Sequence, residues 1–196
     1  MSGKLMRTGK TAPEICAVAE LATDATGLLE ENAEPEAYVR LLIEQDHYPD
    51  AIRFLAHALP KREAVWWAWF CARKAAGDEP PPEIAASLDA TKVWITEPND
   101  ANRRAAMDRA QEADLGTPAG CAGLAAFFCG ESLAPPDLDP VPPDEYAAAK
   151  AITGSIMMAA VSQEPEKAME RFQAYVEQGM EVARKTKLWE PPDKGR

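Results

Sequence analysis

Histidines, cysteines and acidic residues are the side chains of this sequence that could carry chemistry, and their spacing is poor for a metal centre. A di-iron or di-manganese bundle needs two Glu-x-x-His motifs and two further glutamates. The chain holds one such motif, from Glu44 to His47, and two histidines in all. The cysteines show no zinc-ligand spacing with His47 or His57. We therefore expect no metal and no other cofactor.

The cysteines also offer little for nucleophilic catalysis. Each lies among apolar residues and none forms a Cys-x-x-Cys pair, which is typical of small buried side chains. Cys71 or Cys129 could pair with His57 as nucleophile and base, but apolar surroundings raise the pKa of a thiol and no orienting third residue is apparent. No glycine spacing fits a phosphate-binding loop or a dinucleotide-binding fingerprint. We expect a protein that is not an enzyme. The four cysteines are Cys16, Cys71, Cys121 and Cys129.

A basic segment is the best functional signal that the sequence offers. Residues 51–74 carry five basic residues and one acidic residue, a local charge of +4 in a chain whose net charge is −11. Such a segment, interleaved with tryptophan, has the composition of a site that binds an acidic protein surface. The alternative is that these cations pair with carboxylates elsewhere in the fold. The candidate partner-binding residues are Arg53, His57, Lys61, Arg62, Arg73 and Lys74.

Composition excludes other partners and suggests a compartment. With 32 acidic against 21 basic residues, the chain is a poor match for nucleic acid or anionic lipid. Its most apolar stretch, residues 147–161, contains Lys150 and is shorter than the roughly 20 residues that span a bilayer. Residues 1–14 carry positive charge without an apolar segment behind it, so no secretory signal is expected. We expect a cytoplasmic protein that does not insert in membranes, and the oligomeric state stays open.

Prolines mark the expected helices. A proline at the first helical position loses no hydrogen bond, and most of these prolines precede an acidic residue that suits the positive end of a helix dipole. Residues 93–96 could read as a strand, but they fit better as the end of a helix that begins near Pro82. The sequence therefore predicts an all-α fold, an irregular bundle of about nine helices with no significant β-sheet. The helix-starting prolines are Pro13, Pro35, Pro49, Pro60, Pro82, Pro98, Pro118, Pro143 and Pro165.

Two consecutive helices show the strongest patterns. Residues 48–59 place Asp50, Arg53 and His57 opposite an apolar stripe of Ile52, Leu55, Ala56 and Leu59. Residues 61–77 leave little of their circumference polar, which predicts a helix at the centre of the core. Its core candidates are Trp66, Trp67, Trp69 and Phe70. By contrast, the many charges of residues 98–113 predict a solvated surface helix.

Five prolines between residues 131 and 143 exclude a continuous helix there and favour an extended strap. We expect one helical domain over residues 1–196, in which this strap separates helices within residues 12–130 from a C-terminal helical hairpin, residues 144–188. Whether the strap divides two folding units stays open.

One segment also resembles a known family. The run YPDAIRFLAHALPKREAVWWA, residues 48–68, is similar to the core of a family of small, uncharacterised bacterial proteins. The resemblance implies a bacterial protein of unknown function, associated with genes for type VI secretion, and carries over no site residues. We expect a non-enzymatic interaction module, an accessory or adaptor of a secretion system. The alternative is a helical protein that binds a small molecule or cofactor in a tryptophan-lined pocket.

Overall fold

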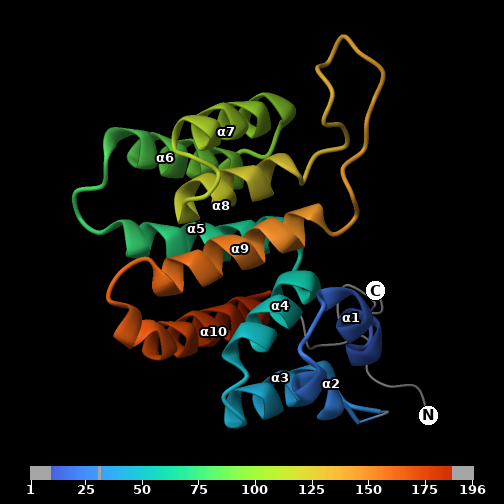
Figure 1. The fold of residues 1–196 in the computed structure, drawn as a ribbon. Helices are drawn as coiled ribbons and strands as arrows, with labels where there is room; N and C mark the ends of the chain where they lie inside the picture. The colour runs from blue at the N-terminus through green and yellow to red at the C-terminus, as the bar shows by residue number, and fades with distance from the viewer. Residues whose placement is uncertain (1–9, 31, 187–196) are drawn as a thin grey trace. The chain divides into compact units, whose positions relative to one another are not determined.

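The fold is entirely helical over the residues that the structure, a computed structural model, describes: 10–30 and 32–186 (Figure 1). These residues form ten α-helices and one short 3-10 helix, with no strand among them, which confirms the predicted all-α class. The expectation of no secretory signal rests partly on residues 1–9, which lie outside the described residues. The end of the expected C-terminal hairpin, residues 187–188, also lies outside them. The helices are α1 (Ala12–Ala19), α2 (Thr23–Gly27), α3 (Pro35–Glu44), α4 (Tyr48–Ala58), α5 (Lys61–Ala76), α6 (Pro82–Thr96), α7 (Asp100–Glu112), α8 (Pro118–Phe127), α9 (Ala147–Val161), η1 (Pro165–Lys167) and α10 (Ala168–Lys185).

Proline and short polar side chains explain where many of these helices begin. Pro35, Pro82 and Pro118 each occupy the first position of a helix, where a backbone N–H would lack an intrahelical acceptor. The Thr117 hydroxyl caps α8 by accepting from the N–H of Gly120 at 3.0 Å. Residues 93–96 are the last turn of α6, as predicted. The short helix α2 was not predicted, because no proline marks its start.

The chain divides into two compact units. The first unit comprises residues 1–60 and 169–196, and the second comprises residues 61–168. This division differs from the expected one, in which residues 131–143 separated the early helices from a C-terminal hairpin. The reason is that α9 packs against α5 and α8, so the proline-rich segment lies within the second unit.

In the first unit, α4 packs against α1 and α3. Its predicted apolar stripe is buried, and Phe54 meets the ring of Tyr38 edge-on at 5.3 Å. Asp50 departs from the prediction, since only 4% of it is exposed although the pattern placed it on the polar face. Hydrogen bonds to its carboxylate explain this burial, because a buried charge is tolerated when it is paired.

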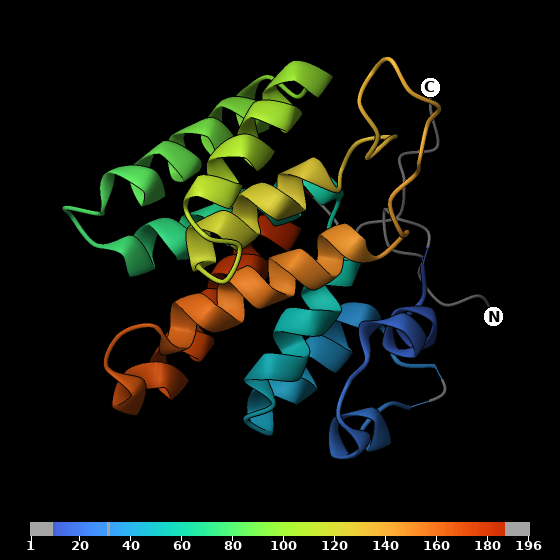
Figure 2. The same ribbon diagram turned by 45° about the horizontal axis from the view of Figure 1, so that its top comes forward.

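In the second unit, α8 is the central helix, since it contacts each of α5, α6, α7 and α9 (Figure 2). Small residues allow this close packing. A Cβ at Gly123 would lie 2.8 Å from the Cβ of Ala110 on α7, closer than ordinary van der Waals contact. The sequence instead predicted α5 as the central helix, because little of the circumference of α5 is polar.

Helix α5 has one buried face and one partly exposed face. Trp67 is fully buried, whereas Trp66, Trp69 and Phe70 are only half-buried, so the core assignment holds for one of the four candidates. Trp66 stacks on Phe70 at 5.5 Å between ring centroids, and the indole N–H of Trp69 donates to the Leu88 carbonyl at 2.9 Å. A polar indole edge with a backbone acceptor explains why Trp69 lies at the rim of the core.

Candidate functional site

The predicted basic residues do not form one cluster in the second unit. Lys61 and Arg62 begin α5 and Arg73 and Lys74 lie in its last turn. At 1.5 Å per residue, Arg62 and Arg73 are separated by roughly 16 Å along the helix axis. The other two candidates, Arg53 and His57, lie on α4 in the first unit.

Three of the guanidinium groups are engaged inside their own unit. Arg53 donates to the buried carboxylate of Asp50 at 3.0 Å. Arg62 donates through Nε to the Ile95 carbonyl at 2.6 Å, at the end of α6, and Arg73 donates to the Gly77 carbonyl. These contacts agree with the alternative of internal pairing, although two of the three acceptors are backbone carbonyls rather than carboxylates.

The remaining candidates on these helices have weaker restraints. The ammonium group of Lys74 lies 5.4 Å from the centroid of the Phe70 ring, within reach of a cation–π interaction. Lys61 is exposed at the start of α5. The Nδ1 atom of His57 lies 2.8 Å from the Arg53 carbonyl oxygen, one helical turn earlier. Lys61 and Lys74 are therefore the two candidates whose exposed charge can be changed without breaking a hydrogen bond of a guanidinium group.

The thiols are poor nucleophiles at neutral pH. Burial raises the pKa of Cys71, raises that of Cys121 to about 11 and raises that of Cys129 to about 12. The thiolate is the reactive form, so these groups are protonated near pH 7. Within residues 10–30 and 32–186, no group of three or more His, Cys, Asp or Glu side chains could hold a metal ion.

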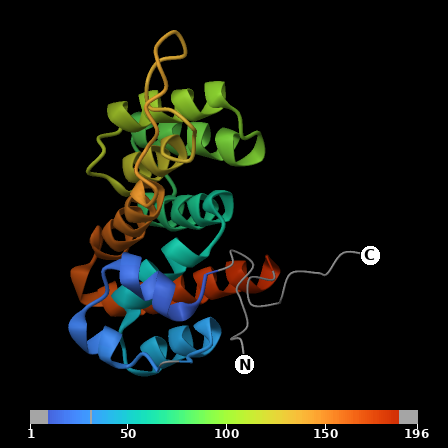
Figure 3. The same ribbon diagram turned by 90° about the vertical axis from the view of Figure 1, so that its right-hand side faces the viewer.

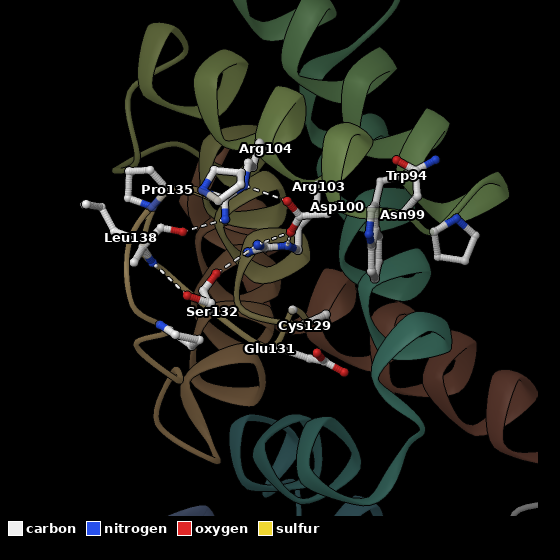
Figure 4. Close-up of a pocket in the computed structure, with 15 residues that line it drawn as sticks. Trp94, Asn99, Asp100, Arg103, Arg104, Cys129, Glu131, Ser132, Pro135 and Leu138 are labelled. Atoms are coloured by element: carbon white, nitrogen blue, oxygen red, sulfur yellow. Dashed lines mark hydrogen bonds and ion pairs between the residues drawn. The ribbon is translucent and has the colours of Figure 1, made fainter.

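The most developed site lies instead on α7, where a cavity of about 500 Å³ opens beside the proline-rich loop, residues 131–143 (Figure 4). Its walls include Trp94 and Asn99 on one side and Pro135 and Leu138 on the other, with Arg103 between them. Both polar and apolar groups line the cavity.

Arg103 is a buried cation with a full set of acceptors. Only 3% of the residue is exposed. Its guanidinium donates 2.8 Å hydrogen bonds to the carbonyls of Phe127 and Ser132, donates to Asp100, and lies 4.7 Å from the Phe127 ring centroid. The planar fork of an arginine suits this geometry, in which one side chain joins α7, the end of α8 and the start of the loop.

Arg104 and Asp100 extend this network. Arg104 donates through Nη2 to the Ala134 carbonyl at 2.6 Å and through Nε to Asp100 at 2.7 Å. Hydrogen bonds from Arg104 and Arg103 hold the pKa of Asp100 below its ordinary value. One carboxylate thus orients two arginines toward three backbone carbonyls, those of Phe127, Ser132 and Ala134.

Gly130 makes room for this network. A Cβ at this position would collide with the guanidinium group of Arg103. The chain between α8 and the loop can therefore pass over the arginine only with glycine there, and any larger residue would displace the arginine or the backbone.

The proline-rich loop is closed at its base rather than extended as a strap. The Ser132 hydroxyl accepts from the N–H groups of Ala134 and Val141 at 3.1 and 3.0 Å, and the Leu133 N–H donates to the Val141 carbonyl at 2.7 Å. A further hydrogen bond, from Leu138 N–H to the Pro135 carbonyl, closes a turn. The loop projects beyond the helices of its unit (Figure 3).

The tip of this loop, residues 135–142, is exposed throughout. Leu138 is 60% exposed and Val141 is 52% exposed, and Asp137 and Asp139 flank Leu138. Leu138 is the most exposed large apolar side chain among the described residues. The tip therefore combines apolar and acidic side chains on a backbone whose base is fixed.

The sequence did not predict this site, because an arginine in a helix with many charges is usually exposed to solvent. The sequence predicted a solvated surface helix over residues 98–113, but α7 buries Arg103, Ala106 and Ala110, followed by Ala113 just after the helix. These four positions are spaced as one helical face, and three of them are alanine. This spacing would have indicated the buried face of α7 if Arg103 had been counted among the buried residues.

A second buried charge lies in the first unit. The Asp50 carboxylate accepts from the Ala22 N–H at 2.9 Å and from Arg53 at 3.0 Å. His47 lies nearby, with Nδ1 3.8 Å from Asp50 and Nε2 4.0 Å from Asp24. This cluster connects α4 to the start of α2.

Comparison with known proteins gives a family but no activity. Among the described residues, no helix has both the length and the apolar character needed to cross a bilayer. No curated protein and no solved structure matches the chain. A family of unknown function (DUF6931) matches residues 38–183, which is most of the sequence, and the chain belongs to this family.

Proposed function

We propose that this chain is a non-enzymatic protein-interaction module that binds its partner through the tip of the proline-rich loop, residues 135–142. The 60% exposure of Leu138 is the observation that carries this proposal. Burying a leucine side chain stabilises a complex by about 1.5–3 kcal/mol. Two large apolar residues held in solvent on one loop are therefore best explained by a partner that covers them.

The fixed base of the loop supports the same function. Hydrogen bonds from Arg103 and Arg104, and those accepted by Ser132, order the backbone before any partner arrives. Five prolines restrict the backbone further. A binding segment that is already ordered loses less conformational entropy on association, so more of its contact energy appears as affinity.

The direct test replaces the apolar tip residue. The tagged full-length protein and its Leu138→Ser variant are each purified from the host after gentle cross-linking, and recovered proteins are quantified by mass spectrometry. We expect at least one partner whose recovery falls about tenfold in the variant, which corresponds to the loss of one buried leucine.

Val93→Ser is the matched control. Val93 is 47% exposed on α6, outside the loop, so its replacement removes a comparable apolar side chain from the same unit. Partner recovery equal in both variants and in the unchanged protein would remove the loop tip from consideration.

The predicted basic residues stay as candidates for a second contact with an acidic surface. Charge reversal at Arg53 or Arg62 would break the contacts with Asp50 or Ile95 and so alter the fold as well as the surface. Lys61→Glu and Lys74→Glu test this contact more cleanly, because both residues are exposed. Unchanged partner recovery with these two variants would exclude it.

A more specific role follows from the resemblance of residues 48–68. It supports an accessory or adaptor of a bacterial type VI secretion system, working in the cytoplasm. Recovery of a secretion component with the unchanged protein, but not with Leu138→Ser, would support this role. A partner from an unrelated pathway would refute it while leaving the interaction function in place.

The cavity beside the loop favours a second candidate, binding of a small molecule. Its volume of about 500 Å³ suits a small ligand, and Trp94 forms part of its wall, although the tryptophans expected in such a pocket were those of α5. Native mass spectrometry of protein purified gently from the host tests this function. A retained mass that disappears in Arg103→Met would support it, and a single mass equal to the bare chain would count against it.

A further inference from the structure

The loop tip has almost no hydrogen-bond donors. Proline has no backbone N–H, and residues 135–142 contain four prolines and no donor side chain. Of the other four N–H groups, that of Leu138 already donates to Pro135 and that of Val141 donates to Ser132. At most two N–H groups, those of Asp137 and Asp139, are left to contact a partner.

Acceptors, by contrast, are abundant at the tip. Among the described residues, hydrogen bonds within the chain engage the carbonyls of Pro135 and Val141, while the other six tip carbonyls have none. The exposed carboxylates of Asp137 and Asp139 add four acceptor oxygens. The tip therefore offers acceptors and apolar side chains together.

The charged residues next to the tip in the sequence are all acidic. Residues 131–145 contain five acidic residues and no lysine, arginine or histidine. The positive charges beneath the loop, Arg103 and Arg104, are already bonded to Asp100 and to loop carbonyls. A partner thus approaches an apolar tip within a negative field.

We infer that the partner is a protein whose binding site is an apolar socket bordered by lysine and arginine side chains. This inference rests on the proposed function and specifies its partner. Leu138 and Val141 enter the socket, and cationic donors at its rim bind Asp137, Asp139 and the tip carbonyls. Acceptors that become buried without donors would weaken the complex, so a rim rich in N–H groups is required.

The shortage of hydrogen-bond donors and the negative charge of the tip argue against two other modes of recognition. Addition of the tip to the edge of a β-sheet needs N–H donors along the strand, and the prolines remove them. Nucleic acid and anionic membranes present phosphate acceptors and negative charge, which the acidic tip would repel.

The first step of the test identifies the site on the partner. A photo-reactive benzoylphenylalanine replaces Pro142 in the full-length protein, because this residue is exposed at the tip and leaves Leu138 and Val141 intact. After irradiation in the host, the cross-linked peptide is sequenced. Capture alone only supplies the partner for the second step.

The second step measures affinity between the purified partner and the full-length protein. The double variant Asp137→Asn/Asp139→Asn removes the tip charges and keeps the shape. We expect its Kd to rise about three- to tenfold, as for two exposed ion pairs. We also expect a smaller change in its Kd between about 50 and about 500 mM NaCl, since fewer charges are screened.

The matched control is Asp89→Asn/Asp108→Asn, which changes the net charge equally at exposed positions on α6 and α7. Its Kd and salt dependence should equal those of the unchanged protein. If both double variants weaken binding alike, overall charge rather than the tip is responsible, and the inference is wrong.

Two outcomes separate this inference from the proposed function. In the first outcome, Leu138→Ser abolishes binding, but neither salt nor Asp137→Asn/Asp139→Asn changes the Kd. This result would refute the basic rim and would still support the interaction function. Failure of the Pro142 position to cross-link to any protein would refute both.

Discussion

Two buried charged residues of opposite sign, Arg103 in the second unit and Asp50 in the first, have the same structural role. Each is about 96–97% buried, and each has its charged partner three residues away on its own helix, Asp100 and Arg53 respectively. Arg103 donates to backbone carbonyls, whereas Asp50 accepts from the backbone N–H of Ala22. Both therefore fix a distant non-helical segment.

The difference lies in what the fixed segment presents. The backbone held by Asp50 leads into α2, and no large apolar side chain described there is exposed. The backbone held by Arg103 leads into the loop that exposes Leu138 and Val141. A buried charge by itself thus indicates a structural restraint. Only when combined with exposed apolar residues does it point to a binding segment.

The largest expected effect is that of Arg103→Met, which keeps an apolar stem and removes the donors. The carbonyls of Phe127 and Ser132 then lose their partners, and we expect the free energy of unfolding to fall by about 2–4 kcal/mol. Urea denaturation measures this fall, and limited proteolysis should show earlier cleavage within residues 131–143. An unchanged urea midpoint together with a protected loop would contradict the assigned role of Arg103.

A smaller effect is expected for Asp50→Ala. This change leaves the Ala22 N–H without its acceptor and Arg53 without its carboxylate, and should destabilise the protein by about 1–3 kcal/mol. Asp50→Asn retains an acceptor for the N–H and should recover part of the loss. Loop proteolysis at residues 131–143 serves as the readout that separates the two sites, and it should not change in either Asp50 variant.

Acid should weaken the restraint on the loop through Asp100. Because Arg104 and Arg103 lower its pKa in the folded protein, Asp100 contributes stability above its unfolded pKa, and this contribution disappears as the pH falls through the lower folded value. The urea midpoint of Asp100→Asn should therefore lie below that of the unchanged protein at pH 7, and the gap should close in strong acid. A gap independent of pH would show that the carboxylate charge has no part in holding the arginines.

Local features of the sequence account for most of the helices. The prolines locate helix starts such as those at Pro35, Pro82 and Pro118, because the missing N–H is a property of one residue. The buried stripe of α4 was likewise readable from spacing alone. Helix α2 was not predicted, because it contains no proline and is too short to show a helical repeat of apolar residues.

The candidate site was much less predictable, since it depends on contacts between residues far apart in the chain. Arg103 reaches carbonyls 24 and 29 residues away, and Ser132 closes the loop onto Val141 nine residues later. The composition of residues 131–143 excluded a continuous helix, and no helix forms there, but composition could not show that the segment closes on itself. Likewise, the local charge of α5 could not show that its arginines bind carbonyls.

The smallest expected effect on stability is that of Leu138→Ser. The side chain is 60% exposed and the loop is held from its base, so the free energy of unfolding should change by less than about 0.5 kcal/mol. Serine at this position keeps the N–H that donates to Pro135. Urea denaturation of the variant beside Arg103→Met measures both residues in one experiment. If Leu138→Ser destabilises the protein as much as Arg103→Met does, the leucine belongs to the packing of the loop rather than to a surface kept for a partner, and the contrast between the two buried charges loses its functional meaning.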